Sequence, residues 1–368
     1  MTEGEKGTKM KDSHDLLRKI IDTDICLEKV GLEEKIKKYD LIKYPELYNF
    51  AHDEKQIKNI ISLLRKLQQC HVIDEKDIVD YIVSLLTHKT HYGFLCELLT
   101  LSYLQRNKVE FDVEVKVDSS KLLSKNNVAL DGYIENIDTY FDVKGFGLQQ
   151  YAKVKFIRLI EPYFPGSSIL IDGFYDVNYA DVENYAFKDK VRIVDELKDK
   201  GRCSIYEINW TVRTSTDRVT SSIGEMNPYC EAENNKNFIF RKCSQFTKDS
   251  PFILICTFEN QFNCNLVTNF SNHTDIMTRS LARRAFIEFN NSTEMANTID
   301  SKCGKDVTLS QASKSLSGIL FLDAYNDKSW MYLNPNAYNK LDRYKLERAF
   351  DFRLPYEMYV DDFQNDNY

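Results

Sequence analysis

The sequence predicts an α/β protein: a mixed sheet flanked by helices, with a helical region before it and a further α/β segment after it. Helix-like and strand-like patterns alternate through residues 91–211, which is typical of α/β domains. Residues 1–90 show helical spacing alone, and residues 212–368 carry three more buried-strand patterns. We therefore expect a helical N-terminal region, a core, and a C-terminal extension that either continues the same sheet or recognises substrate.

Apolar residues recur at helical spacing in two stretches of the N-terminal region. One follows Asp53 and the other follows Asp74, each of which is a suitable helix cap. The apolar positions are Ile57, Ile60, Ile61, Leu64 and Leu67 in the first stretch, and Ile78, Tyr81, Ile82 and Leu85 in the second. This region is expected to dock on the core or to mediate self-association, and a structural lid is the favoured interpretation.

The core is expected to begin with a helix and a strand. Residues 92–105 place Phe94, Leu98, Leu101 and Leu104 on one apolar face, and residues 109–117 alternate apolar with polar, which indicates a half-buried strand. Two strands follow, on either side of the polar turn at 135–138. The later patterns predict a helix at 148–161, a strand at 167–172, a helix at 181–200, a strand at 203–209, and the buried strands of the extension at 251–258, 316–323 and 330–334.

Two aspartates lie on the expected hairpin. Side chains alternate along a strand, so Asp142 and Lys144 share one face. If the hairpin is centred between Asn136 and Ile137, Asp131 faces Asp142 with Cβ atoms about 4.5–5.5 Å apart. This register is an assumption, because Asn-Ile is not a favoured two-residue turn, and a slip by one residue would turn Asp131 to the opposite face.

A third carboxylate lies on the preceding helix. Glu97 follows Phe94 by three residues and precedes Leu101 by four, so it lies against the apolar stripe. A carboxylate in that place needs a partner or shifts its pKa, and a shared metal ion or Lys144 would serve. Taken singly, these residues fit a solvated strand face, a turn and an ion pair; together they favour a site.

This joint pattern resembles the PD-(D/E)xK nuclease superfamily, the fold of many restriction endonucleases. The family core is α-β-β-β-α-β, with an acid on the first helix, an aspartate on the second strand and (Asp/Glu)-x-Lys on the third. Glu97, Asp131, Asp142 and Lys144 match those positions, and the resemblance covers residues 91–210. The proline that names the motif is absent, because Leu130 precedes Asp131.

The resemblance implies a magnesium-dependent DNA endonuclease of restriction or phage-defence type, with Mn²⁺ as a substitute ion. Asp131 and Asp142 would hold the metal, with Glu97 as a further ligand or partner. Lys144 would lower the pKa of the attacking water or stabilise the developing charge. Cutting both strands makes a homodimer plausible. An RNA nuclease and a non-catalytic nucleic-acid-binding protein on the same fold are the alternatives.

Three basic clusters are candidates for phosphate contact, although each is equally compatible with a solvated face. They are Lys153, Lys155 and Arg158 after the motif; Arg213 and Arg218 in a Thr/Ser-rich stretch; and Arg279, Arg283 and Arg284 on an expected helix. The net charge of −7 argues against a wholly basic coat but leaves room for a local basic groove.

The composition and short motifs of the chain argue against several other classes of protein. No Gly-rich phosphate loop accompanies Gly145 and Gly147, so no nucleotide cofactor is expected. Nine cysteines occur without Cys-x-x-Cys spacing, which indicates reduced thiols. No run of 18 or more apolar residues and no signal-peptide pattern is present, and we therefore expect a cytoplasmic protein without a membrane partner.

Overall fold

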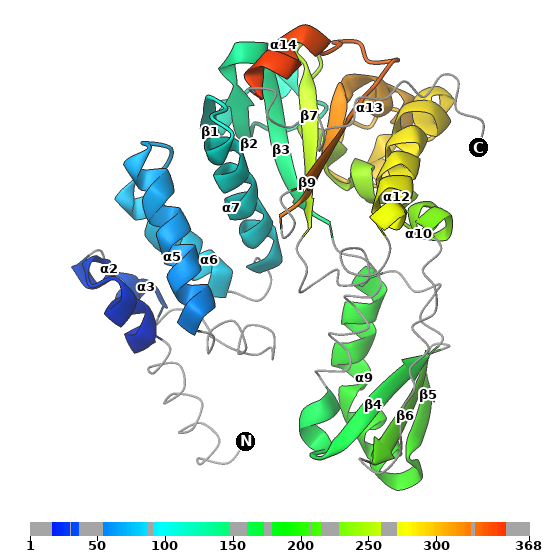
Figure 1. Ribbon diagram of the computed structural model, residues 1–368. Helices are drawn as coiled ribbons and strands as arrows, with labels where there is room; N and C mark the ends of the chain where they lie inside the picture. The colour runs from blue at the N-terminus through cyan, green and yellow to red at the C-terminus, as the bar shows by residue number, and fades with distance from the viewer. Residues whose placement is uncertain are drawn as a thin grey trace.

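A six-stranded mixed sheet forms the centre of this computed structural model, and helices cover both of its faces (Figure 1). The structure describes residues 17–29, 31–36, 54–86, 91–146, 160–172, 179–205, 208–214, 228–258, 271–324 and 328–350. The α/β class expected from the sequence is therefore confirmed. No helix in these ranges is long and apolar enough to cross a membrane.

The sheet joins two antiparallel edges through a parallel centre. Its strand order is β1-β2-β3-β7-β8-β9, with bounds Phe111–Val117, Val128–Ile134, Thr139–Gly145, Phe252–Phe258, Gly318–Asp323 and Lys328–Leu333. The pairs β3–β7 and β7–β8 are parallel, and the other three are antiparallel. All residues of β7 and β8 are buried, as expected for parallel strands covered on both faces.

Alternating residues of the central strands enter two separate cores. Phe141, Val143 and Ile253 pack toward the face covered by α7 (His91–Arg106), with α5 (Glu54–Gln69) and α6 (Glu75–Leu86) behind it. Leu254 and Phe258 pack toward the face covered by α10 (Pro228–Asn234), α12 (Ser271–Arg283), α13 (Leu309–Ser315) and the 3-10 segment Lys236–Gln245. The other described helices are α2 (Cys26–Lys29), α3 (Leu32–Ile36), α9 (Tyr179–Lys200) and α14 (Arg343–Ala349). Shorter helical turns are Ser119–Lys121, Glu135–Ile137, Glu161–Tyr163, Arg284–Glu288, Phe289–Asn291 and Ala296–Thr298.

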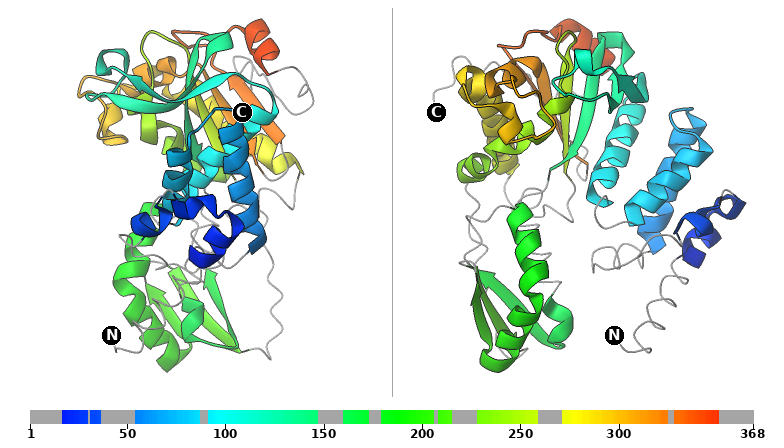
Figure 2. Two further views of the ribbon diagram at one scale, coloured as in Figure 1. Left: turned by 90° about the vertical axis from the view of Figure 1, so that its left-hand side faces the viewer. Right: turned by 180° about the vertical axis from the view of Figure 1, so that it is seen from behind.

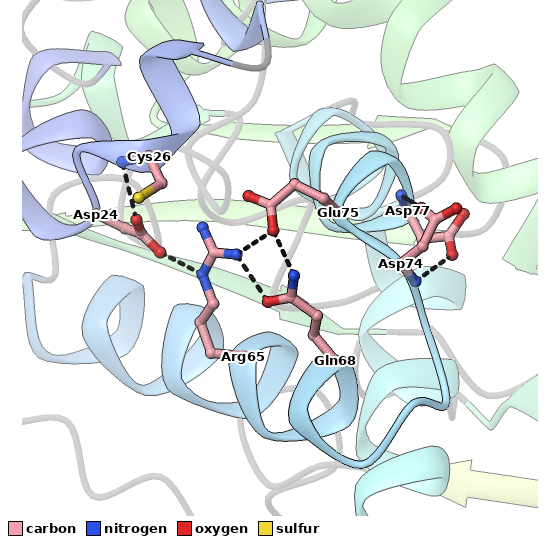
Figure 3. Close-up of polar contacts among 7 residues, drawn as sticks. All are labelled: Asp24, Cys26, Arg65, Gln68, Asp74, Glu75 and Asp77. Atoms are coloured by element: carbon pink, nitrogen blue, oxygen red, sulfur yellow. Dashed lines mark hydrogen bonds and ion pairs between the residues drawn. The ribbon is translucent and has the colours of Figure 1, made fainter.

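The helical N-terminal region docks on the core through α7. The apolar residues expected in α5 and α6 are buried, and both helices contact α7. A polar network ties this region together: Arg65 on α5 donates to Asp24, to Gln68 and to Glu75 on α6 (Figure 3). The described residues of this region form the helices α2, α3, α5 and α6.

A second, three-stranded antiparallel sheet lies apart from the first (Figures 1 and 2). Its order is β4-β6-β5, with bounds Ser167–Asp172, Ile208–Thr214 and Arg202–Ile205, and α9 packs against it. Here the structure differs from the expected core, because these strands do not join the sheet that holds β3.

The difference has a physical cause in the sequence. A strand beside β3 in a parallel sheet must be apolar on both faces, and β7 meets this requirement with seven buried residues. The stretch 203–209 alternates polar with apolar, which suits a sheet with one solvated face, and it is divided between β5 and β6. The six-stranded sheet consequently draws strands from both sides of the boundary expected at residue 211. The helix expected at 148–161 falls largely outside the described residues.

Candidate active site

The hairpin β2–β3 has the register expected from the sequence. Gly132 pairs with Phe141, Tyr133 with Tyr140 and Ile134 with Thr139, so the hairpin is centred between Asn136 and Ile137. The connection is not a two-residue turn. Residues 135–137 form a 3-10 turn, followed by Asp138 with φ 49° and ψ 53°, a left-handed conformation that aspartate tolerates. The hydroxyl of Tyr133 donates to Asp138 at 2.7 Å, which fixes the turn.

Asp131 and Asp142 occupy the next position of this register, where β2 and β3 part. Beyond Gly132, β2 continues to pair with β1, and β3 continues to pair with β7. The carboxylate of Asp131 accepts a hydrogen bond from the backbone N–H of Val143 at 2.6 Å. Its side chain thus supplies the acceptor that the departing strand no longer provides, and this bond holds Asp131 beside β3.

Gly132 is required for this arrangement. A Cβ atom at this residue would clash with the ring of Phe141 and with the backbone oxygen of Asp112. The Asp131-Gly132 pair is therefore not a turn signal. The glycine lets the Phe141 ring pack over the strand, which keeps β2 and β3 in register up to the two aspartates.

Glu114 on β1 is a fourth carboxylate that sequence reasoning missed. It lies between Val113, which pairs with Gly132, and Val115, which pairs with Leu130, so it stands opposite Asp131. Its φ of 50° is left-handed, which costs about 1–3 kcal/mol for a non-glycine residue. Such strain is found at functional sites, and the only sequence signal for Glu114 was its place on the polar face of the expected strand.

Glu97 reaches the site from α7, which packs against β3 and β7. Its carboxylate accepts a hydrogen bond from the hydroxyl of Tyr81 on α6, so the partner that its apolar surroundings demanded is a tyrosine. Burial raises the pKa of Glu97, and the charges of Asp142 and Glu114 raise it further, while Tyr81 and Lys242 oppose the shift.

Asp142 is fully buried and is held by two side chains from the segment Lys236–Gln245. The Nζ atom of Lys242 donates to Oδ2 at 2.8 Å, and Nε2 of Gln245 donates to Oδ1 at 3.0 Å. Lys242 also donates to the backbone oxygen of Val143 at 3.1 Å. Both residues lie at least 100 positions beyond Asp142, and no local pattern in the sequence marks them.

Lys144 shares the strand face of Asp142, but its ammonium group has another partner. It donates to the backbone oxygen of Phe238 and lies 4.1 Å from the centroid of the Phe238 ring. Burial lowers the pKa of Lys144 to about 7. The lysine that contacts an aspartate of the expected set is therefore Lys242, whereas Lys144 is a desolvated amine close by.

The carboxylates outnumber the positive charges around them. Burial, followed by the charges of Asp142 and Glu97, raises the pKa of Asp131 to about 8, although Lys242 opposes the shift. Burial by itself lowers the pKa of Lys242, but Asp142, Asp131 and Glu97 outweigh it and raise that pKa. A site in which burial and mutual repulsion oppose ionisation gains by binding a cation.

The donor set fits Mg²⁺ or Mn²⁺ in chemistry, because both ions prefer carboxylate oxygens. The three expected ligands, Glu97, Asp131 and Asp142, do not form a compact group of ligand atoms. Among the described residues, only Cys243, Asp300 and Cys303 bring three ligand atoms within 4.8 Å of one another. The oxygens of Glu97, Asp131 and Asp142 thus lie further apart, with the Lys242 ammonium bonded to one of them.

The expected phosphate-binding residues do not form one cluster. Lys153, Lys155, Arg158 and Arg218 lie outside the described residues. Arg213 is exposed on β6 in the three-stranded sheet, whereas Arg283 is half-buried at the end of α12. The adjacent Arg284 is paired with Glu233 and Glu288.

Comparisons with protein-family models, with curated proteins and with solved structures each find no match to this chain.

Proposed function

We propose that this protein is a metal-dependent nuclease that hydrolyses phosphodiester bonds, with Mg²⁺ as its ion and Mn²⁺ as a substitute. The observation that carries the proposal is the meeting of Asp131 and Asp142 where β2 and β3 part, with Asp142 fully buried and bonded to a lysine. Carboxylates held together in a buried site favour the binding of a cation, and metal-assisted hydrolysis of a phosphodiester uses one.

Each residue of the site has a role in this proposal. Asp131 and Asp142 would hold the ion, with Glu97 as a further ligand or partner. When bound, Mg²⁺ supplies Lewis-acid polarisation of the phosphate and a water of lowered pKa. Gln245 fixes the orientation of the Asp142 carboxylate through Oδ1.

The two lysines have different chemical capacities. Lys242 is cationic, because the surrounding carboxylates raise its pKa, and it is suited to stabilising negative charge that develops on a phosphate. Lys144, with a pKa of about 7, is divided between its charged and neutral forms at neutral pH. It is therefore suited to accepting or returning a proton.

DNA is the proposed substrate and endonucleolytic cleavage the proposed reaction, in a restriction or phage-defence setting and with a homodimer to cut both strands. These finer assignments rest on the resemblance carried by Glu97, Asp131, Asp142 and Lys144. RNA cleavage is the competing reaction class, and it is an arm of the test below.

The experiment is cleavage of supercoiled plasmid and of labelled RNA, each with Mg²⁺, with Mn²⁺ and with EDTA. The wild type should nick or linearise plasmid only with metal. Asp142→Asn should reduce cleavage by about a hundredfold to a thousandfold, the size of effect seen when a charge-stabilising group is removed. Asp138→Asn is the matched control, because it removes a carboxylate from the same hairpin at a turn where asparagine is tolerated.

Cleavage of RNA alone would transfer the proposal to an RNA nuclease. Absence of cleavage of both substrates, or equal activity of Asp142→Asn and the wild type, would contradict it. Identical purification of all three proteins separates the activity of this chain from that of a contaminating nuclease.

A further inference from the structure

Two buried cysteines and an aspartate meet at the segment that supplies Lys242. The Sγ atoms of Cys243 and Cys303 are 3.2 Å apart, and both residues are 0% exposed. The carboxylate of Asp300 completes the group, with its ligand atoms all within 4.8 Å of one another. The two cysteines are 60 positions apart in the chain, so folding brings them together.

Asp300 is buried, and it has no cationic partner among the residues that the structure describes. It is 7% exposed, and its oxygens accept from the backbone N–H groups of Ser244 at 3.0 Å and Lys302 at 3.1 Å. Within the described ranges, no lysine or arginine side chain comes within ion-pair distance of it. A buried carboxylate in that state is costly, and two thiols beside it offer no positive charge to offset the cost.

We propose that Cys243, Cys303 and Asp300 bind a thiophilic divalent metal ion, with Zn²⁺ as the principal candidate. Two thiolates and one carboxylate form a set that zinc accepts and that Mg²⁺, which prefers oxygen, does not. Binding releases the two thiol protons to solvent, so the ligands carry three negative charges against the two positive charges of the ion.

The geometry requires only a small adjustment. Two Zn–S bonds of about 2.3 Å at a tetrahedral angle separate the sulfurs by roughly 3.8 Å, so Cys243 and Cys303 move slightly apart on loading. Three protein ligands leave one of the four zinc positions for a water molecule. The two backbone N–H groups that hold Asp300 orient the carboxylate, as partners outside the ligand set do at metal centres.

This site is independent of the proposed nuclease activity, but it lies next to residues of the candidate active site. Cys243 directly follows Lys242 and precedes Gln245 by two residues, and those two hold Asp142. A metal bound here ties the segment Lys236–Gln245 to the loop containing Asp300 and Cys303. The inferred role of the metal ion is structural, because the ion fixes the position in which Lys242 and Gln245 face the sheet.

The test is the metal content of the full chain, purified without chelators and without a metal-affinity step, and then dialysed against metal-free buffer. Elemental mass spectrometry should find about one zinc per chain. Cys243→Ala, Cys303→Ala and Asp300→Asn should each lower the content at least tenfold. Cys256→Ala is the matched control, because Cys256 is equally buried on β7 and lies outside the group.

A second measurement needs no variant and so does not depend on whether the variants fold. Wild-type protein stripped of metal and titrated with Co²⁺ should develop a thiolate-to-cobalt charge-transfer band that saturates near one equivalent and that Zn²⁺ removes. Absence of both the zinc and this band in folded wild type overturns the proposal. A Cys243–Cys303 disulfide found by non-reducing peptide mapping also overturns it. Zinc retained in Asp142→Asn would show that this site stands even where the nuclease proposal fails.

Discussion

The ammonium group of Lys242 lies 2.8 Å from Oδ2 of Asp142, a carboxylate with no exposed surface. Lys242 therefore provides the positive charge that the Asp142-Val143-Lys144 spacing alone would have assigned to Lys144. The contact links the sheet to a segment 100 residues further along the chain. It also places a cation among carboxylates that are chemically suited to a metal ion, so we expect a metal ion bound there to compete with the ammonium group for Asp142.

Removing this lysine should destabilise the metal-free protein. Lys242→Met keeps most of the side-chain length but leaves Asp142 without its charged donor. We expect the free energy of unfolding in EDTA to fall by about 1.5–3 kcal/mol, the value of a hydrogen bond to a charged group. Magnesium should restore more stability to the variant than to the wild type, because the ion no longer displaces an ammonium group.

Urea denaturation in EDTA and in excess Mg²⁺ measures both effects. Lys236→Met is the control: Lys236 lies in the same segment and is paired with Glu233 at the surface, where an ion pair contributes less than about 1 kcal/mol. Equal stabilisation of wild type and Lys242→Met by magnesium would show that Lys242 and the ion do not share Asp142.

The stability of the metal-free protein should depend on the ionisation of Asp131. Burial and its neighbours raise the pKa of this residue to about 8, above the value of about 3.9 in an unfolded chain. Between these two values the native state holds a proton that the unfolded state has lost. The free energy of unfolding therefore falls as the pH rises from about 4 to about 8.

Asp131→Asn removes this titration while its side-chain oxygen still accepts from Val143. In EDTA at pH 8 the variant should be more stable than the wild type by up to about 5 kcal/mol, since the pKa of Asp131 is raised by about four units and each unit corresponds to about 1.4 kcal/mol. Thermal unfolding across the pH series measures the difference. A variant that loses stability with rising pH as steeply as the wild type would assign the titration to other groups.

Replacing glycine with alanine should have opposite effects on stability at Gly132 and at Gly93. Gly132→Ala places a Cβ atom against the Phe141 ring and the Asp112 backbone, so overpacking should cost at least about 1–3 kcal/mol. Gly93→Ala lies in α7 with nothing within 4 Å of the added atom, and it should stabilise by about 0.5–1 kcal/mol. The denaturant midpoints of the two variants, compared with that of the wild type, measure both effects. If Gly132→Ala leaves the stability unchanged, the close contact with Phe141 and Asp112 is contradicted.

The parts of the site that could be predicted from sequence are those set by short-range rules. Alternation along a strand and a short polar turn at residues 135–138 placed Asp131 opposite Asp142. Helical spacing placed Glu97 on an apolar face. These relationships depend on residues near one another in the chain, and local geometry restricts them to few alternatives.

The remainder depends on contacts that no local pattern encodes. Lys242 and Gln245 lie in the segment that precedes β7, and the pairing of β7 with β3 places that segment beside Asp142. Lys144 turns toward Phe238 for the same reason. The left-handed backbone of Glu114 breaks the propensity of its strand, and local rules are expected to fail at such strained positions.

Binding of nucleic acid can be measured in the Asp142→Asn background, where cleavage should be strongly reduced. Arg213 is exposed on β6, so Arg213→Gln should make the slope of log affinity against log salt shallower by about one unit, which corresponds to one lost phosphate contact. Arg284→Gln should leave the slope unchanged, because Glu233 and Glu288 already hold that guanidinium. Fluorescence anisotropy with a labelled duplex over a salt series measures both slopes. If Arg213→Gln and the unsubstituted background give the same slope, the three-stranded sheet does not contact phosphate, and the binding surface lies elsewhere on the protein.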